Sequence, residues 1–243
     1  MNPILVALDV DAAADALALA GTLRGAVGGF KIGSQLFTSA GPTIVRALVD
    51  HGDRVFLDLK FHDIPNTVAG AVAAATELGV WMLNVHASGG QAMMAAARES
   101  ADRRASALGI ARPIVIGVTV LTSLDAAALA SVGVARTPLA QVVDLARLAA
   151  RAGLDGVVAS PLETRAIRDA CGSDFVIVTP GIRGGDALAR PDDQQRTMSP
   201  VDAIAAGSSF LVIGRPITGA TDPRAAAERI AAAIARDTTS RRR

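Results

Sequence analysis

The sequence predicts a single-domain α/β fold, a (β/α)8 TIM barrel with parallel strands. Eight short apolar runs recur along the chain, and segments with helical spacing of apolar residues separate them. Runs without polar alternation are typical of parallel strands that are buried on both faces. An open doubly wound sheet is the alternative. However, no Gly-x-Gly-x-x-Gly turn follows the first run, where a dinucleotide-binding fold would have one.

The expected elements alternate from one end of the chain to the other. Strands are expected at residues 3–9, 29–33, 54–60, 81–87, 113–121, 156–160, 175–180 and 209–214. The clearest helical spacing lies at residues 12–24, 42–51, 69–78, 138–152 and 224–236. No linker divides the chain, so residues 1–237 are assigned to one catalytic barrel and residues 238–243 to a basic, frayed tail.

The composition favours a small-molecule partner in the cytoplasm. The 24 Lys and Arg nearly balance the 23 Asp and Glu, and six Phe and one Trp offer little for base stacking, so nucleic acid is not expected as a partner. No uncharged run approaches the length of a membrane span, and Asp residues interrupt any signal-like segment at the N-terminus. A single cysteine, Cys171, fits a reducing compartment and a buried, structural role.

Polar residues recur where the expected strands end. Active sites of such barrels lie at the carboxyl ends of the strands, so these side chains are expected to meet at one mouth. After the seventh and eighth strands, the turns TPGIRGGD and IGRPIT each combine glycine with arginine, which predicts a phosphate site. The polar residues at the other strand ends are Asp9, Lys31, Asp58, Lys60, Asn84, His86, Thr119, Thr122 and Ser123.

The stretch RVFLDLKFHDIPNT, residues 54–67, has the densest set of charges on an apolar strand. Alternation places Phe56, Asp58 and Lys60 on one face. An exposed ion pair is the simpler interpretation. A strand buried on both faces makes a functional pair more plausible, because unpaired buried charge is costly. Asp63, just before Ile64 and a proline, could be only a helix N-cap.

Other polar residues have structural interpretations. Asp11 fits the N-cap of the first helix better than Asp9 does. His62 and His86 are interpreted as structural. No His, Cys or carboxylate spacing is typical of a metal site, and lysine within the acidic cluster supplies positive charge, so we expect a site without metal.

Taken together, the motifs resemble the orotidine 5′-phosphate decarboxylase family over nearly the whole chain. They are ALD, FKIG, FLDLKFHDIPNT, LNVHASGG, TVLTS, TPGIR and VIGRPIT, in this order. The resemblance implies conversion of orotidine 5′-phosphate to UMP and carbon dioxide, the last step of de novo pyrimidine synthesis. It also implies that the reaction needs no cofactor and no metal.

The resemblance assigns catalytic roles to four residues. It implies that Lys60 delivers a proton to C6 of the base as carbon dioxide leaves. Asp58 would lie beside the substrate carboxylate, and Lys31 and Asp63 would complete a charged array.

Further residues are implied in substrate binding. Asp9 and Lys31 would contact the ribose hydroxyls, and Thr122 the edge of the pyrimidine. Arg183 would begin a closing loop. Gln194 would contact base and phosphate, although Gln195 is an alternative for this role. Arg215 and the backbone of Gly214 would bind the phosphate.

Members of this family are dimers. The resemblance implies a homodimer in which Asp63, Ile64 and Thr67 reach into the neighbouring subunit's site.

Two other functions remain open from the sequence. The first is a metal-dependent sugar-phosphate decarboxylase, aldolase or epimerase on the same barrel, which would share the Asp-x-Lys-x-x-Asp spacing. The second is a catalytically silent barrel that binds nucleotides, which the intact set of Asp58, Lys60 and Asp63 disfavours.

Overall fold

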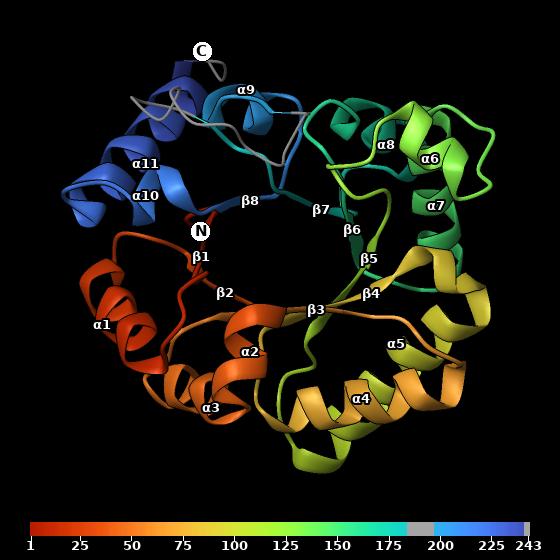
Figure 1. The fold of residues 1–243 in the computed structure, drawn as a ribbon, viewed down its shortest axis with the longest axis horizontal. Helices are drawn as coiled ribbons and strands as arrows, with labels where there is room; N and C mark the ends of the chain where they lie inside the picture. The colour runs from red at the N-terminus through yellow and green to blue at the C-terminus, as the bar shows by residue number, and fades with distance from the viewer. Residues whose placement is uncertain (184–196, 241–243) are drawn as a thin grey trace.

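The structure, a computed structural model, is a closed parallel barrel surrounded by helices (Figure 1). It describes residues 1–183 and 197–240. Within these residues each strand pairs with its neighbours in the sequence, and β1 pairs with β8 to close the barrel. The predicted (β/α)8 barrel is therefore confirmed, and the open doubly wound sheet is excluded.

The strands lie within three residues of their predicted bounds. They are β1 (Ile4–Ala7), β2 (Gly29–Gly33), β3 (Val55–Phe61), β4 (Met82–His86), β5 (Ile114–Val118), β6 (Gly156–Val158), β7 (Val176–Thr179) and β8 (Phe210–Ile213). The helices are α1 (Ala13–Leu23), α2 (Ser34–Ala40), α3 (Thr43–Asp50), α4 (Pro65–Glu77), α5 (Gly90–Leu108), α6 (Ala126–Ser131), α7 (Pro138–Arg151), α8 (Thr164–Cys171), α9 (Pro200–Ala205), α10 (Arg215–Thr218) and α11 (Pro223–Ser240).

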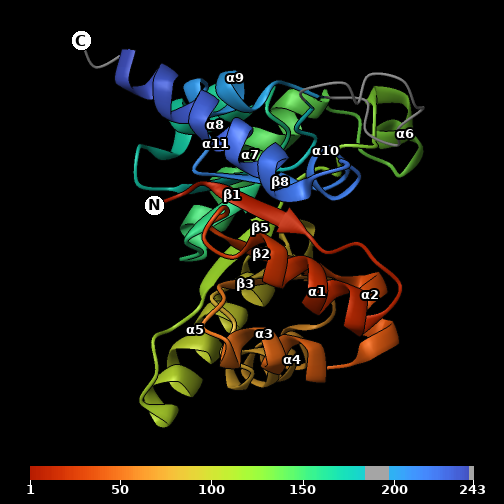
Figure 2. The same ribbon diagram turned by 90° about the vertical axis from the view of Figure 1, so that its left-hand side faces the viewer.

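All strands point the same way, which defines a single mouth. In Figure 2 the arrow of β1 points toward the side where α6 and α10 lie, while the N-terminus and the end of α11 lie at the other side. The helices α6 and α10 follow the carboxyl ends of β5 and β8. In the described part of the chain, no helix combines the length and the apolar character that a membrane span requires.

Successive side chains of each strand point to opposite faces, and this alternation produces two hydrophobic layers. Phe56 joins Leu5, Met82, Ile116 and Val178 in a cluster inside the barrel. The neighbouring residue Leu57 instead joins the larger cluster between the strands and the helices. The strand β3 keeps this alternation up to Asp58. The side chain of Asp58 therefore shares the face of Phe56, as predicted, and this face points into the barrel.

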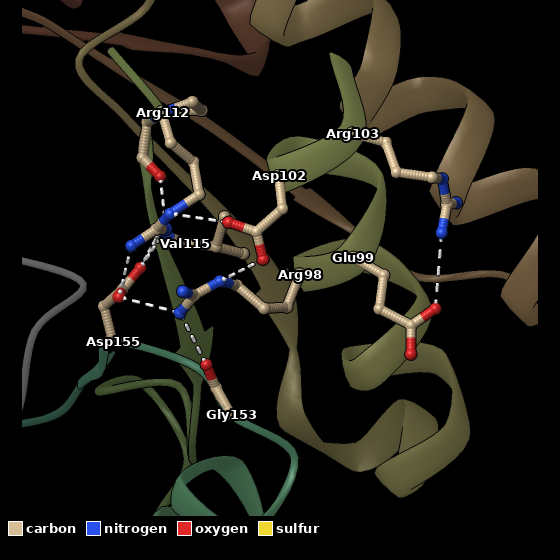
Figure 3. Close-up of polar contacts among 9 residues, drawn as sticks. Arg98, Glu99, Asp102, Arg103, Arg112, Val115, Gly153 and Asp155 are labelled. Atoms are coloured by element: carbon tan, nitrogen blue, oxygen red, sulfur yellow. Dashed lines mark hydrogen bonds and ion pairs between the residues drawn. The ribbon is translucent and has the colours of Figure 1, made fainter. Parts of the chain in front are cut away.

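The opposite end of the barrel carries an ion-pair cluster. Asp155, just before β6, accepts hydrogen bonds from the side chains of Arg98 and Arg112 and from the backbone N–H of Val115 (Figure 3). Arg98 and Arg112 also both pair with Asp102 at 3.0 Å. These contacts tie α5 to the amino ends of β5 and β6. In such barrels this end serves stability rather than chemistry.

Two predicted helix ends differ from the structure. Helix α4 begins at Pro65, four residues before the prediction, because proline suits the first helical position, where its missing N–H is not needed. Helix α11 continues to Ser240, so residues 238–240 of the predicted frayed tail are helical. The Thr238 and Thr239 hydroxyls donate to the carbonyls of Ile234 and Ala235. Residues 241–243 lie outside the described part.

The capping roles considered for Asp11 and Asp63 are wrong. The N-caps of α1 and α4 are Ala12 and Ile64, and neither makes a side-chain cap hydrogen bond. Asp11 instead accepts a hydrogen bond from Gln35 at 2.6 Å, which ties the start of α1 to α2.

Candidate active site

A cavity of about 480 Å³ opens at the carboxyl ends of the strands. Apolar residues such as Phe56, Val118 and Val212 form part of its wall. Eight of the predicted site residues also line it, namely Asp9, Lys31, Asp58, Lys60, Thr122, Arg183, Gly214 and Arg215. The fold thus brings together residues from the first strand to the last.

Charges of alternating sign form a chain across one wall of this cavity. Lys31 Nζ lies 3.0 Å from Asp9 Oδ1 and 3.6 Å from Asp58 Oδ2. The other oxygen of Asp58, Oδ1, lies 2.8 Å from Lys60 Nζ. Each ammonium therefore contacts at least one carboxylate, and each interior carboxylate oxygen has a cationic partner. This arrangement stabilises charges that would be costly to bury singly.

This row of four charged side chains is most buried in its middle, and its ends are open to the cavity. The side chains of Lys31 and Asp58 are 10% and 13% exposed, whereas Lys60 is 34% exposed. A Cβ at Gly33 would lie 2.9 Å from Lys31 Nζ, so glycine leaves room for the ammonium. The protein contains only two lysines among its 24 basic residues, and both belong to this chain of charges.

The backbone of strand β3 is irregular at Lys60. The backbone of Lys60 has a φ of 54°, the one positive φ of a non-glycine residue in the described chain. The register between β3 and β4 shifts between Leu57 and Phe61. The sequence predicted a regular strand here, which would have given Lys60 a negative φ.

Asn84 on β4 contacts both residues of the Asp58–Lys60 pair. Its Oδ1 accepts from the backbone N–H of Lys60 at 2.8 Å, and its Nδ2 donates to Asp58 Oδ1 at 2.7 Å. The residue is fully buried. From the sequence, Asn84 was expected only as a polar residue at a strand end, and no role was assigned to it. The available signal was an amide within an otherwise apolar strand, which needs buried partners.

Two histidines lie next to the charged wall. The rings of His62 and His86 are 5.2 Å apart between centroids and are tilted by 34°. Burial lowers the pKa of His86, with smaller contributions from His62 and from the ammonium of Lys60, while Asp58 acts in the opposite direction. The neutral imidazole is thus favoured, and the structural role of His86 stays a prediction.

The turns after β7 and β8 form another part of the cavity wall. Gly181, Arg183, Gly214 and Arg215 line it, and Arg215 begins α10. A parallel bridge between Ile182 and Met198 joins the two chain segments that flank residues 184–196. Gln194 and Gln195, the alternatives for a base and phosphate contact, lie outside the described residues.

Asp63, Ile64 and Thr67 do not line the cavity. They lie at the start of α4, where all three are exposed, and Ile64 keeps 66% of its surface accessible. Asp63 Oδ1 accepts a hydrogen bond from the backbone N–H of Ile64 at 2.6 Å. Within this subunit the predicted charged array therefore contains Lys31, Asp58 and Lys60 but not Asp63.

The donor set of the cavity suits an anionic organic ligand better than a metal ion. Among residues 1–183 and 197–240, no three His, Cys, Asp or Glu side chains are grouped as metal ligands. Asp9 and Asp58, which could offer carboxylate oxygens, already pair with Lys31 and Lys60. The guanidinium groups of Arg183 and Arg215 add positive charge to the wall.

Comparison with known proteins shows which family this sequence matches. Residues 2–230 match the orotidine 5′-phosphate decarboxylase / HUMPS family. The chain is 56% identical to orotidine 5′-phosphate decarboxylase of Moorella thermoacetica over 234 residues, which cover 96% of this chain and 92% of the relative. The enzyme of the same name from Syntrophotalea carbinolica is 56% identical over 227 residues, which cover 93% and 92% of the two chains.

Solved structures give the same result for the fold. The crystal structure of orotidine 5′-phosphate decarboxylase from Lactobacillus acidophilus superposes with a TM-score of 0.84 at 37% identity. The superposition covers 96% of this chain and 99% of the other. The similarity therefore extends over the whole barrel and its mouth.

Proposed function

The chain belongs to the orotidine 5′-phosphate decarboxylase / HUMPS family, and from this premise we propose that it converts orotidine 5′-phosphate to UMP and carbon dioxide, the last step of de novo UMP synthesis. The observation that carries the proposal is the alternating chain Asp9–Lys31–Asp58–Lys60 on one wall of the cavity. It puts an ammonium group beside a buried carboxylate, where a reaction that generates a carbanion needs both positive charge and a proton.

In the proposed reaction, the bond between C6 and the carboxylate carbon breaks and its electron pair stays on C6. That carbanion lies in the plane of the ring and has no adjacent π system to accept its charge. Lys60 stabilises it electrostatically and then transfers a proton from Nζ to C6, which yields UMP and a neutral amine. Solvent returns the proton to Lys60. A fixed ammonium in a site shielded from water is far more effective than one in bulk solvent.

Asp58 has two roles in this proposal. Its contact of 2.8 Å with Nζ orients the ammonium of Lys60 before the reaction. Its negative charge also lies where the substrate carboxylate would bind, so departure of neutral carbon dioxide relieves repulsion. Lys31, held by Asp9 and Asp58, keeps the buried carboxylate balanced and faces the expected position of the ribose.

The phosphate is assigned to the wall formed by Gly214 and Arg215, with Arg183 nearby. A guanidinium group can donate two parallel hydrogen bonds to phosphate oxygens. Binding energy from this remote group can serve to fix the base against Lys60, so the phosphate contributes to rate as well as affinity. Thr122 is assigned to the pyrimidine edge and Gln194 to base and phosphate contacts.

The functional unit is proposed to be a homodimer. Asp63, Ile64 and Thr67 follow β3 in the sequence, and they are exposed and outside the cavity of their own subunit. This placement supports a role across an interface, in which Asp63 completes the neighbouring subunit's charged array. In the proposed dimer the side chain of Ile64, 66% exposed in the single subunit, would be buried against the partner. The cytoplasmic location stays a prediction.

The proposal is tested by mixing purified protein with orotidine 5′-phosphate in the presence of EDTA and following the loss of substrate absorbance. We expect turnover that the chelator does not change, because Lys31 and Lys60 supply the positive charge. Activity on a sugar phosphate that EDTA abolishes would instead favour the metal-dependent alternative. Binding of UMP without any turnover would favour the catalytically silent barrel.

A further inference from the structure

Asn84 is the one residue of β4 that faces the irregular part of β3. Leu57 pairs with Leu83, and Phe61 pairs with Val85. Three residues of β3, from Asp58 to Lys60, therefore lie opposite Asn84 alone. A regular parallel ladder cannot pair three residues with one, so the backbone of this segment needs other hydrogen-bond partners.

The side chain of Asn84 supplies such a partner. Leu83 and Val85 belong to the outer hydrophobic layer, so alternation turns Asn84 into the barrel interior, as it does Met82. There its carbonyl oxygen accepts the N–H of Lys60, whose φ of 54° is a conformation that residues other than glycine rarely adopt. This hydrogen bond holds the backbone of Lys60 in that conformation.

The amide nitrogen of Asn84 acts on the other member of the pair. It donates to Asp58 Oδ1, the same oxygen that lies 2.8 Å from Lys60 Nζ. Because an N–H must donate and a carboxylate must accept, the two partners fix which way the amide points. One side chain thus sets the backbone of Lys60 and the orientation of Asp58 at the same time.

We propose that Asn84 is a positioning residue for decarboxylation, which holds the Lys60 ammonium and the Asp58 carboxylate in their productive geometry. The inference rests on the proposed function of this site. Asn84 does not line the cavity, so it acts through Asp58 and Lys60 and not by touching substrate. Its full burial means that solvent does not replace the amide's hydrogen bonds.

Two substitutions separate the hydrogen bonds of Asn84. Asn84→Leu keeps a similar volume and removes both. Asn84→Asp keeps an acceptor for the N–H of Lys60 but loses the donor to Asp58. Thr119→Val is the matched control, because Thr119 is 4% exposed at the carboxyl end of β5, does not line the cavity and donates one hydrogen bond, to the carbonyl of Val158 at 2.8 Å.

The measurements are thermal unfolding, kcat and KM for orotidine 5′-phosphate between pH 5 and 9, and the Kd of UMP by calorimetry. For Asn84→Leu we expect kcat to fall by about 100-fold, since small displacements of reacting groups cost that much, while the Kd of UMP changes by less than about threefold. For Asn84→Asp we also expect a lower kcat, because a second carboxylate would then face Asp58 Oδ1 in place of the N–H donor and would displace the pair. Thr119→Val should lose stability but keep the wild-type kcat and pH profile.

If wild-type protein decarboxylates the substrate and Asn84→Leu matches Thr119→Val in kcat and in pH profile, the inference about Asn84 is overturned while the proposed function stands. It is also overturned if neither Asn84 variant folds, because the residue would then serve the barrel and not the site. Absence of turnover in wild-type protein would remove the proposed function and this inference with it.

Discussion

Asp58 Oδ1 and Lys60 Nζ lie 2.8 Å apart, and the two residues are separated by a single position on one strand. In a regular strand, residues at this spacing share one face, so alternation already puts the two side chains on the same side. The left-handed backbone of Lys60 and the register shift of β3 accompany the close contact. The chemistry assigned to Lys60 depends on this contact.

Replacement of Lys60 by alanine is expected to abolish turnover and leave the barrel folded. A positioned general acid contributes ~10²–10⁴-fold, and the loss of its electrostatic stabilisation adds to this. The control is Arg46→Ala, which removes an exposed cation on α3. Substrate absorbance measures the rate and circular dichroism the fold. A folded Lys60→Ala protein with more than a small fraction of wild-type kcat would contradict the proton-donor role.

Substitution Arg215→Ala is expected to weaken UMP binding by about 10- to 100-fold, the usual effect of losing a charge-assisted hydrogen bond. The affinity for uridine, which lacks the phosphate, should stay the same. Arg229→Ala on the exposed side of α11 serves as control. Calorimetry with both ligands measures the difference, and equal losses for UMP and uridine would remove Arg215 from the phosphate site.

A charge at position 64 is expected to split the proposed dimer. The side chain of Ile64 is 66% exposed in the single subunit and would be buried in the proposed interface. Ile64→Arg should yield monomers by light scattering, because the dimer would then have to bury a charge there. Activity should fall as well, since Asp63 would no longer reach a partner. Leu162→Arg, at 58% exposure on the segment after β6, is the matched control. A fully dimeric Ile64→Arg protein would argue against this interface.

Stability is expected to depend on the protonation of His86. Burial lowers its pKa in the folded state below the ordinary value of 6.5, so the unfolded state binds the proton more readily. Its contribution to the free energy of unfolding is therefore complete above pH 6.5 and is lost as the pH falls below that value toward the folded-state pKa. The difference between wild type and His86→Phe should shrink on acidification.

Urea denaturation between pH 7.5 and pH 5 measures this difference. His51→Gln, which changes an exposed histidine at the end of α3, should give a curve parallel to that of the wild type. Parallel curves for His86→Phe and wild type would contradict the linkage.

The ion-pair cluster at the amino end of the barrel is expected to support stability alone. Asp155→Asn should lower the free energy of unfolding by about 2 kcal/mol, because Arg98 and Arg112 lose a charged acceptor. Asp102→Asn should cost less than about 1 kcal/mol, since Asp102 is 48% exposed against 20% for Asp155. Denaturant titration measures both, and kcat should be unchanged. A large loss of kcat in Asp155→Asn would indicate coupling to the mouth.

The sequence was sufficient for the barrel and for much of its charged wall. Lys31 stood out because an ionisable side chain in a buried strand needs partners, and the structure gives it Asp9 and Asp58. The turns after β7 and β8 were expected at the same mouth because parallel strands share their direction, and Gly181 and Gly214 both line the cavity. The family resemblance is confirmed by the comparisons.

Other features depend on contacts between segments far apart in the sequence. The role inferred for Asn84 follows from the register between β3 and β4, which no local pattern encodes. The end of α11 differs locally instead: the composition indicated a frayed end, whereas the helix continues to Ser240 and the Thr238 and Thr239 hydroxyls bond to carbonyls of the same helix. The assignments of Gln194 and of Asp63 across a dimer stay predictions, because the first lies outside the described residues and the second needs a partner chain.

With arginine at every other basic position, the side-chain amines of this protein are confined to Lys31 and Lys60. Protein labelled with ¹⁵N-lysine would therefore give two side-chain signals, and both would report directly on the charged wall. Amine-directed reagents would in the same way find only these two groups and the N-terminus.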